Sequence, residues 1–176
     1  MYSFNILFVG RFIERKGVLL FLETAKRLPN FGFHLVGAGS LEQKVVKASK
    51  ELKNVFYYGA LMQSKKKDLD RLLNLYSSCD FLLSPYLYDE GFSATLIESL
   101  SCGTPVIVPK RGSPPTFLSE KVAVFLSENP SSKEIANVLS KIFKNKESVI
   151  LMKKRARDFA LKNFGFGNAD VIINSY

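Results

Sequence analysis

The chain has 176 residues, 47% of them apolar and 23% charged, which suits one globular domain and would be a tight fit for two. This balance excludes a disordered tail, a collagen and a disulfide-dense miniprotein. Lys and Arg outnumber Asp and Glu by 25 to 16, a net charge of +9, which suggests either an anionic partner such as a phosphate or simply a basic chain.

Short apolar runs alternate with helical patterns along the whole chain. The first run ends at Gly10 and is typical of a buried strand, whereas Leu19, Leu22 and Ala25 recur near helical spacing. Six strands are predicted, at residues 4–9, 33–36, 55–58, 81–83, 105–108 and 122–126. Helices are predicted at residues 16–28, 41–52, 69–76, 94–100, 133–143, 148–163 and 168–176.

This alternation, with short connections, predicts an α/β fold: a Rossmann-like, doubly wound parallel sheet of about six strands with helices on both faces. In such sheets ligands bind outside the carboxyl ends of the strands. The chemistry is therefore expected in the loops that follow Val9, Val36, Tyr58, Leu83 and Val108.

The loop after the first predicted strand is basic. Gly10 lets a ligand approach the backbone, and Arg11 and Lys16 flank a segment that opens a helix. A guanidinium and an ammonium beside a helix N-terminus suit a diphosphate, although the spacing is neither a P-loop nor G-x-G-x-x-G. Taken alone, the loop fits a solvated basic turn better than a diphosphate site.

The loop after the fourth predicted strand combines acceptors and donors. Glu90 precedes Gly91, and Ser93 is positioned to cap the next helix, whose first amides would face an anion. Glu98, in the first turns of that helix, is suited to accept hydrogen bonds from ribose hydroxyls. The alternative is that Glu98 only balances the helix dipole.

Several motifs together resemble the retaining nucleotide-sugar glycosyltransferases of group 1, also called family 4. The stretch EGFSATLIESLSCGTPVIV is similar to their E-x7-E region, with Glu90 and Glu98 as its carboxylates. FVGRFIERKG resembles their diphosphate loop, and LVGAG, NVFYYGAL and the final NFGFGNADVIINSY also fit. The resemblance covers nearly the whole chain, with the motifs in the family's order.

The resemblance implies one half of a GT-B fold, in which two Rossmann-like domains face each other across a cleft. Residues 1–176 would be the single donor-binding domain, and the amino-terminal acceptor domain would be absent from this chain. Arg11 and Lys16 would bind the diphosphate and stabilise charge on the departing nucleotide, and Glu90 would contact the donor sugar. The implied donor-binding residues are Gly10, Gly39, Gly91, Phe92, Ser93, Ala94, Thr95 and Glu98.

The implied function is transfer of a hexose from a nucleotide sugar to a sugar or lipid-linked acceptor, with retention. No cofactor and no metal are expected, and the chain alone should show little or no transfer. The alternative is the half-domain of a sugar-nucleotide epimerase or phosphorylase of similar fold. A nucleic-acid-binding module is motivated only by the +9 charge and lacks an aromatic-basic signature, so no nucleic-acid partner is expected.

The expected partners are a nucleotide sugar and the missing domain, in cis or as a separate subunit, with peripheral membrane contact as an option. The sequence shows no secretory signal and no apolar run of membrane-spanning length, so the expected location is the cytoplasm. Attachment to the cytoplasmic face of a membrane is an option within this expectation. Cys79 and Cys102 are expected to be free thiols, and His34 to pack or hydrogen-bond within a strand.

One loop departs from the family pattern. Many relatives carry Gly-Gly-x-Pro-Glu after the fifth strand, whereas this chain has Gly112-Ser113-Pro114-Pro115-Thr116, with threonine where glutamate is usual. The two basic residues before it, Lys110 and Arg111, are expected to face either the diphosphate or the missing domain.

Overall fold

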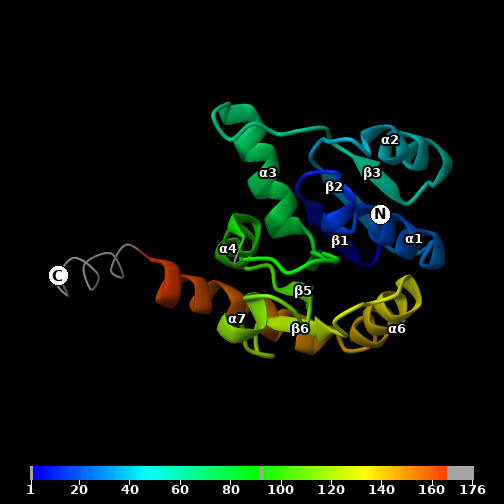
Figure 1. Cartoon of the computed structure of the whole chain (residues 1–176). Coiled ribbons are helices and arrows are strands. Elements are labelled where there is room, and N and C mark those ends of the chain that lie inside the picture. The colour runs from blue at the N-terminus through cyan, green and yellow to red at the C-terminus, as the bar shows by residue number, and fades with distance from the viewer. Residues whose placement is uncertain (1, 92, 166–176) are drawn as a thin grey trace.

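The computed structural model describes residues 2–91 and 93–165. Within these ranges six strands form one parallel sheet in the order β3-β2-β1-β4-β5-β6, which confirms the predicted fold class (Figure 1). The strands are β1 Asn5–Val9, β2 Gly32–Val36, β3 Val55–Tyr57, β4 Phe81–Leu83, β5 Val106–Pro109 and β6 Ala123–Leu126.

The helices agree with the predicted ones except at a few ends. They are α1 Val18–Arg27, α2 Glu42–Glu51, α3 Lys66–Ser78, α4 Ala94–Ser101, α5 Pro114–Phe117, α6 Ser132–Phe143 and α7 Lys146–Phe164. The predicted start of the first helix at residue 16 is wrong, because Gly17 has a left-handed φ of 73° and separates the 3-10 turn Glu14–Lys16 from α1. The short α5 was not predicted, and the predicted helix 168–176 lies outside the described residues.

Alternate residues of each strand enter two separate apolar cores, one on each face of the sheet. Ile6 and Phe8 of β1 pack into the core that α1, α2 and α6 cover, whereas Leu7 joins the core under α3 and α4 (Figure 1). α7 contributes to both, with Val149 and Met152 in the first core and Ala156 and Ala160 in the second. Both faces are thus buried, as a parallel sheet requires.

The strand order reverses direction between β1 and β4. β1 pairs with β2 on one side and with β4 on the other, so the chain leaves the carboxyl ends of β1 and β4 toward opposite sides of the sheet. A crevice forms at such a switch point, and ligands bind there in open α/β sheets. The register that pairs Leu7 with Leu82 brings the loops of residues 10–17 and 84–93 to this crevice.

Close backbone contacts lock these loops together. Gly17 lies against the loop after β4, where a Cβ on it would come within 1.9 Å of the Pro85 carbonyl oxygen. The amide of Leu87 donates to the Arg15 carbonyl at 2.9 Å, which ties the same two loops once more. Gly37, at φ 144°, would likewise place a Cβ 1.9 Å from the Gly10 carbonyl oxygen.

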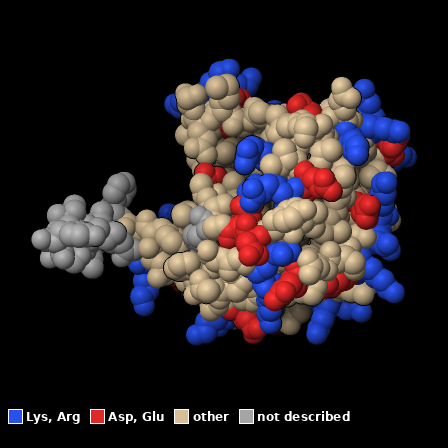
Figure 2. Space-filling view, viewed as in Figure 1, with Lys and Arg blue, Asp and Glu red and all other residues tan. Residues whose placement is uncertain are grey.

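On the face seen in Figure 2, basic side chains are spread over the surface and alternate with acidic ones. Lys65, Lys66 and Lys67 are exposed at the start of α3. Lys153 of α7, by contrast, donates to the Cys79 carbonyl at 2.7 Å, and Arg157 donates to the Ser101 carbonyl. These two cations complete the C-termini of α3 and α4, where the helix dipole favours positive charge.

Among the described residues, no helix is long and apolar enough to cross a membrane. Cys79 and Cys102 are both free thiols, as predicted.

His34 of β2 forms a hydrogen-bonded network within the sheet, as predicted. Its Nδ1 lies 2.7 Å from the Tyr58 hydroxyl and its Nε2 lies 3.0 Å from Oδ1 of Asn5. The ring stacks on Phe56 at a centroid distance of 4.9 Å. Burial lowers the pKa of His34 from 6.5 to about 4, because desolvation disfavours the imidazolium.

This pKa predicts a loss of stability in acid. Between pH 6.5 and about 4 the unfolded chain binds a proton at His34 that the folded chain does not, so the free energy of unfolding falls as the pH falls. After allowance for solvent around the partly buried ring, the loss should be about 2 kcal/mol. Urea unfolding of wild type and of His34→Gln, at pH 7 and at pH 4.5, measures this.

The glutamine variant keeps hydrogen-bonding groups but does not titrate, so its pH dependence should be shallower than that of wild type. Asp80, whose pKa burial raises, contributes the opposite slope and is present in both proteins. Equal pH dependence in both would contradict the assignment to His34.

The contact between Gly17 and Pro85 predicts a large loss of stability in Gly17→Ala. Gly59→Ala is a matched control, because Gly59 has a similar φ of 77° against 73° but no atom within 4 Å of the position that a Cβ would take. The control should cost about 1 kcal/mol for the left-handed backbone alone. Gly17→Ala should cost about 2 kcal/mol more, since the Pro85 carbonyl must move. Equal urea midpoints for the two variants would refute the close contact.

Candidate functional site

The loop between β1 and α1 carries the cationic side of the site. Its backbone follows the loop after β2, because the amide of Phe12 donates to the Ala38 carbonyl at 2.8 Å. Arg11 is exposed at the start of this loop. Lys16 ends the 3-10 turn with a side chain that is only 21% exposed, because it points toward the neighbouring loop after β4.

Glu90 meets these cations from the loop after β4. Its Oε2 accepts a 2.8 Å hydrogen bond from Nζ of Lys16. Its Oε1 lies 3.3 Å from Nη2 of Arg15, close enough for an ion pair but without hydrogen-bond geometry. Among the described residues nothing donates to this buried oxygen, so Glu90 keeps one acceptor for a ligand.

Two adjoining cavities occupy the crevice at the switch point. The first, of about 200 Å³, is lined by Gly10, Arg11, Lys16, Ser84, Tyr86, Glu90, Gly91, Ser93, Ala94 and Thr95, among others. The second, of about 270 Å³, is lined by Gly10, Arg11, Gly37, Ala38, Ala60, Leu61, Gln63, Thr95 and Glu98, among others. Because Gly10, Arg11 and Thr95 border both, the cavities form one continuous depression.

The N-terminus of α4 opens onto the first cavity. Ser93 is the N-cap residue with an extended backbone, as the sequence predicts, but its hydroxyl lies 3.0 Å from that of Thr95 and does not cap the helix. No side chain of the described residues therefore caps the first backbone amides of α4. These amides face the cavity and can donate to an anion there. Phe92, also predicted here, lies outside the described residues.

Glu98 is held at the rim of the second cavity by two donors. The Tyr76 hydroxyl donates to Oε2 at 2.8 Å, and the Gln63 amide donates to Oε1 at 2.9 Å. Burial and the Glu98 charge raise the pKa of Tyr76, so its hydroxyl keeps the proton that it donates. These bonds give Glu98 a fixed orientation, beyond any effect on the helix dipole.

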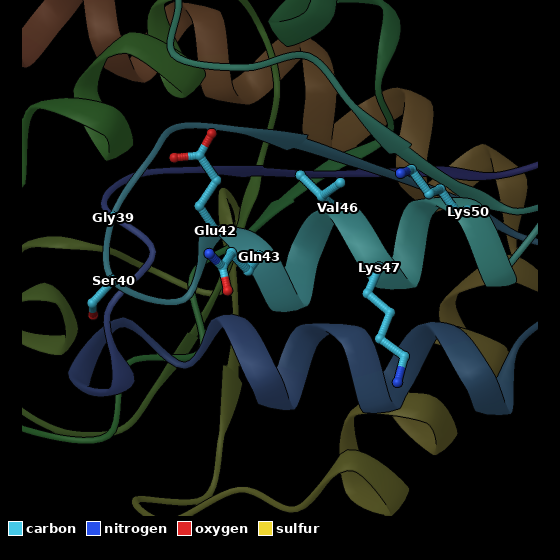
Figure 3. A pocket seen from close by; sticks show the side chains of 7 residues that line it. All are labelled: Gly39, Ser40, Glu42, Gln43, Val46, Lys47 and Lys50. Carbon is cyan, nitrogen blue, oxygen red and sulfur yellow. The ribbon is translucent and has the colours of Figure 1, made fainter.

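Gly39 lies against Phe12 of the loop after β1 but lines neither cavity of the crevice. It borders a broader cavity of about 720 Å³ along α2, with Ser40, Glu42, Gln43, Val46, Lys47 and Lys50 (Figure 3). Glu42 and Lys47 point away from each other in Figure 3, and Glu42 already accepts from the Tyr57 hydroxyl at 2.5 Å. The polar side chains of the described residues therefore do not converge in this larger cavity. Gly39 itself packs on Phe12, where a side chain would not fit.

Arg15, Tyr76 and Gln63 belong to the site but were not singled out from the sequence. Arg15 lies beside Lys16 in the basic loop, so the basic composition of this loop is a sequence signal that could have identified it as a site residue. Tyr76 and Gln63 come from α3 and the loop before it, and only their contacts with Glu98 reveal them. Nothing in their local sequence marks them.

The loop that departs from the family pattern packs against Glu90. Arg111 lines neither cavity of the crevice, and its guanidinium binds groups of its own chain, so of the two expected positions the one at the diphosphate is not observed. Lys110 is exposed. The Thr116 hydroxyl donates to the Ser113 carbonyl at 2.7 Å and so closes α5 locally.

The arrangement pairs a cationic rim and a helix N-terminus with two oriented carboxylates. Arg11, Arg15 and Lys16 outnumber Glu90, so the first cavity favours an anion such as a diphosphate. Glu98 can accept hydrogen bonds from hydroxyl groups, and so can Oε1 of Glu90, which is ion-paired with Arg15 but accepts no hydrogen bond from the described residues. A ligand that carries both phosphates and sugar hydroxyls would offer an anion to the cationic groups and donors to the two carboxylates.

Curated relatives of known sequence share this chain's pattern over most of its length. An uncharacterized glycosyltransferase of Methanocaldococcus jannaschii is 26% identical over 92% of the chain and 44% of the relative. The lipopolysaccharide 1,2-N-acetylglucosaminetransferase of Salmonella typhimurium is 24% identical over 93% and 45%, respectively. The chain thus spans less than half the length of these relatives.

Solved structures share the fold. Anabaena HepE in complex with UDP matches with a TM-score of 0.76 and 19% identity, over 97% of this chain and 49% of that chain. The C-terminal domain of a group 1 glycosyltransferase family protein (LpcC) from Francisella tularensis matches with a TM-score of 0.73 and 20% identity, over 94% and 88%.

The profile of the family described as glycosyl transferases group 1 matches residues 3–159, which include both loops of the crevice and the whole sheet. The chain therefore belongs to the group 1 glycosyltransferases, and it corresponds to their C-terminal, GT-B-type domain.

Proposed function

We propose that this chain is the nucleotide-sugar-binding domain of a retaining glycosyltransferase that transfers a hexose from an NDP-sugar to a sugar or lipid-linked acceptor. The observation that carries the proposal is the position of Glu90, which is paired with Lys16 beside the open N-terminus of α4. A diphosphate and a sugar bound there would each find matching groups. The similarity of the E-x7-E segment to the retaining enzymes supports retention.

The nucleoside belongs in the second cavity. Glu98, held by Tyr76 and Gln63, would accept hydrogen bonds from the ribose hydroxyls. The base would lie near Gly37–Ala38 and Ala60–Leu61, where the lining is backbone and small or apolar side chains. The UDP in the HepE structure supports a nucleotide in a domain of this fold.

The diphosphate and the sugar belong in the first cavity. When the bond from the anomeric carbon to the diphosphate breaks, negative charge develops on the departing phosphate oxygen. Arg11, Lys16 and the first amides of α4 would stabilise that charge, since they are fixed in place before the reaction. In this proposal these positive groups do the work of a metal ion, so transfer would need neither a metal ion nor another cofactor. Oε1 of Glu90, which accepts no hydrogen bond from the described residues, would accept one from the sugar.

The acceptor side of the reaction would come from outside this chain. Residues 1–176 form one donor-binding domain in this proposal, and an amino-terminal domain would supply the acceptor site and close the cleft. The fraction of the curated relatives that the chain covers, 44% and 45% for two of them, supports this division. Alone, the chain would lack the groups that orient the acceptor, so it would transfer little sugar.

Nucleotide binding tests the proposal directly. In calorimetric titrations with UDP, GDP and ADP, at least one should bind the wild-type chain. Lys16→Ala should weaken that binding about 10- to 100-fold, because a charged hydrogen bond to the diphosphate is lost and Glu90 loses its main counter-charge. Lys26→Ala, on the exposed side of α1, is the charge-matched control and should bind as wild type does. Failure of all three nucleotides to bind would refute the proposal.

Glu90 should distinguish a sugar nucleotide from a plain nucleotide. In Glu90→Gln the acceptor for the sugar weakens while the repulsion of the diphosphate disappears, so NDP binding should hold or improve. The affinity for the corresponding NDP-glucose, relative to the NDP, should fall about tenfold. Glu14→Gln, an exposed carboxylate on the same rim, should leave the ratio unchanged. An unchanged ratio in Glu90→Gln would remove Glu90 from the sugar site.

A further inference from the structure

Arg111 joins three segments of the chain behind the crevice. Its Nη1 donates to the Leu87 carbonyl at 2.6 Å and lies 3.0 Å from Oδ1 of Asn129 and 3.3 Å from the Glu128 carbonyl. Its Nε donates to Oδ1 of Asp89 at 3.2 Å. With 22% of the side chain exposed, this arginine is far more enclosed than a solvated surface cation.

The backbone around Arg111 makes a second set of contacts with the same loop. The Tyr86 hydroxyl donates to the Arg111 carbonyl at 3.0 Å, and the Ser113 amide donates to the Glu90 carbonyl at 2.9 Å. Between them Gly112, at φ 65°, lies so close that a Cβ on it would come within 2.5 Å of the Glu90 carbonyl oxygen. The loop after β5 thus lies alongside the loop that carries Glu90.

Glu90 depends on such support, because it stands in a loop and not in a helix or strand. Between the end of β4 at Leu83 and the start of α4 at Ala94, no described residue belongs to either kind of element. Two cations, Arg15 and Lys16, pull on the carboxylate from the other loop. On the other side, the Ser113 amide donates to the Glu90 carbonyl at 2.9 Å and so fixes the backbone from which this carboxylate projects.

We propose that Arg111 is a positioning residue for Glu90: its guanidinium ties residues 87–89 to the turn at 128–129 and so holds the carboxylate where the donor sugar binds. This inference rests on the proposed function of Glu90. Arg111 does not line either cavity of the crevice, so it acts through the loop and not by contact with the ligand.

Arg111 holds the loop through its hydrogen bonds to the Leu87 and Glu128 carbonyl groups, and not through its ion pair with Asp89. The Asp89 side chain is 79% exposed, and an exposed ion pair contributes little because water screens it. The bond to Leu87 is short and comes from a charged donor, which makes it the stronger tie. Arg111→Gln removes this tie, whereas Asp89→Asn removes only the ion pair.

The position of the contact predicts which part of a ligand is affected. The nucleoside cavity near Glu98 and Ala60 lies on the other side of the switch point and shares no residue with the Arg111 contacts. Loss of Arg111 should therefore weaken the binding of the sugar more than that of the nucleotide, whose nucleoside lies in the second cavity and whose diphosphate also meets Arg11 and Lys16. A general loss of structure would instead weaken both.

The experiment compares wild type, Arg111→Gln, Arg111→Lys, Asp89→Asn and, as the charge-matched neighbour, Lys110→Gln. Each is titrated with UDP, GDP and ADP and with UDP-glucose, GDP-mannose and ADP-glucose. For the pair that wild type binds, Arg111→Gln should weaken the sugar nucleotide about tenfold and the nucleotide less than about twofold. Arg111→Lys should be intermediate, and Asp89→Asn and Lys110→Gln should bind both ligands as wild type does.

Hydrogen exchange of the free chain gives a readout that needs no ligand. The amide of Leu87, which donates to the Arg15 carbonyl, and the amide of Ser113, which donates to the Glu90 carbonyl, should exchange about tenfold faster in Arg111→Gln than in wild type, and at the wild-type rate in Lys110→Gln. Unchanged exchange, or an equal loss of affinity for nucleotide and sugar nucleotide, would overturn the role of Arg111. If Asp89→Asn lost as much affinity for the sugar nucleotide as Arg111→Gln, the ion pair and not the bond to the Leu87 carbonyl would hold the loop.

A wild-type chain that binds no nucleotide would refute the proposed function. The exchange rates would still decide whether Arg111 holds the loop.

Discussion

The reversal of strand order between β1 and β4 is the constraint on which the whole site depends. Because the sheet is parallel, every strand ends at the same edge, and because the order reverses there, the chain departs to opposite sides and leaves a crevice. The pairing of Leu7 with Leu82 then brings a basic loop and an acidic loop to one place, although Lys16 and Glu90 are 74 residues apart along the chain. In the proposed function, the diphosphate sugar takes its binding groups from both loops.

Close contacts between loop backbones turn this proximity into fixed geometry. Gly17 against Pro85, Gly37 against Gly10 and Gly112 against Glu90 each leave no room for a side chain. Loops held in this way add little to the ordering cost of ligand binding at the moment when the ligand arrives. The ion pair between Lys16 and Glu90 fits the same scheme, since it keeps a cation and a carboxylate in place beside a helix N-terminus that has no side-chain cap from the described residues.

The sequence predicts the sheet and the carriers of charge better than it predicts their partners. Short apolar runs locate all six strands of the described chain, because burial on both faces demands such runs, and glycine marks the ends of the first three. Arg11, Lys16, Glu90 and Glu98 are visible from their motifs. The helix start after Gly17 depends on a backbone angle, and the roles of Tyr76, Gln63 and Arg111 depend on contacts over 22, 35 and 24 residues, so no local pattern contains them.

The net charge of +9 gains a different meaning from these contacts. Lys153 and Arg157 close the C-termini of α3 and α4, and Arg111 binds groups of two other segments, so part of the positive charge meets the chain's own carbonyl oxygens. Guanidinium and ammonium groups stabilise such oxygens as well as they stabilise a phosphate. A basic composition therefore does not by itself indicate an anionic partner here. That indication comes from Arg11 and Lys16, which line a cavity at the carboxyl end of the sheet, and from Arg15, which pairs with Glu90 beside it.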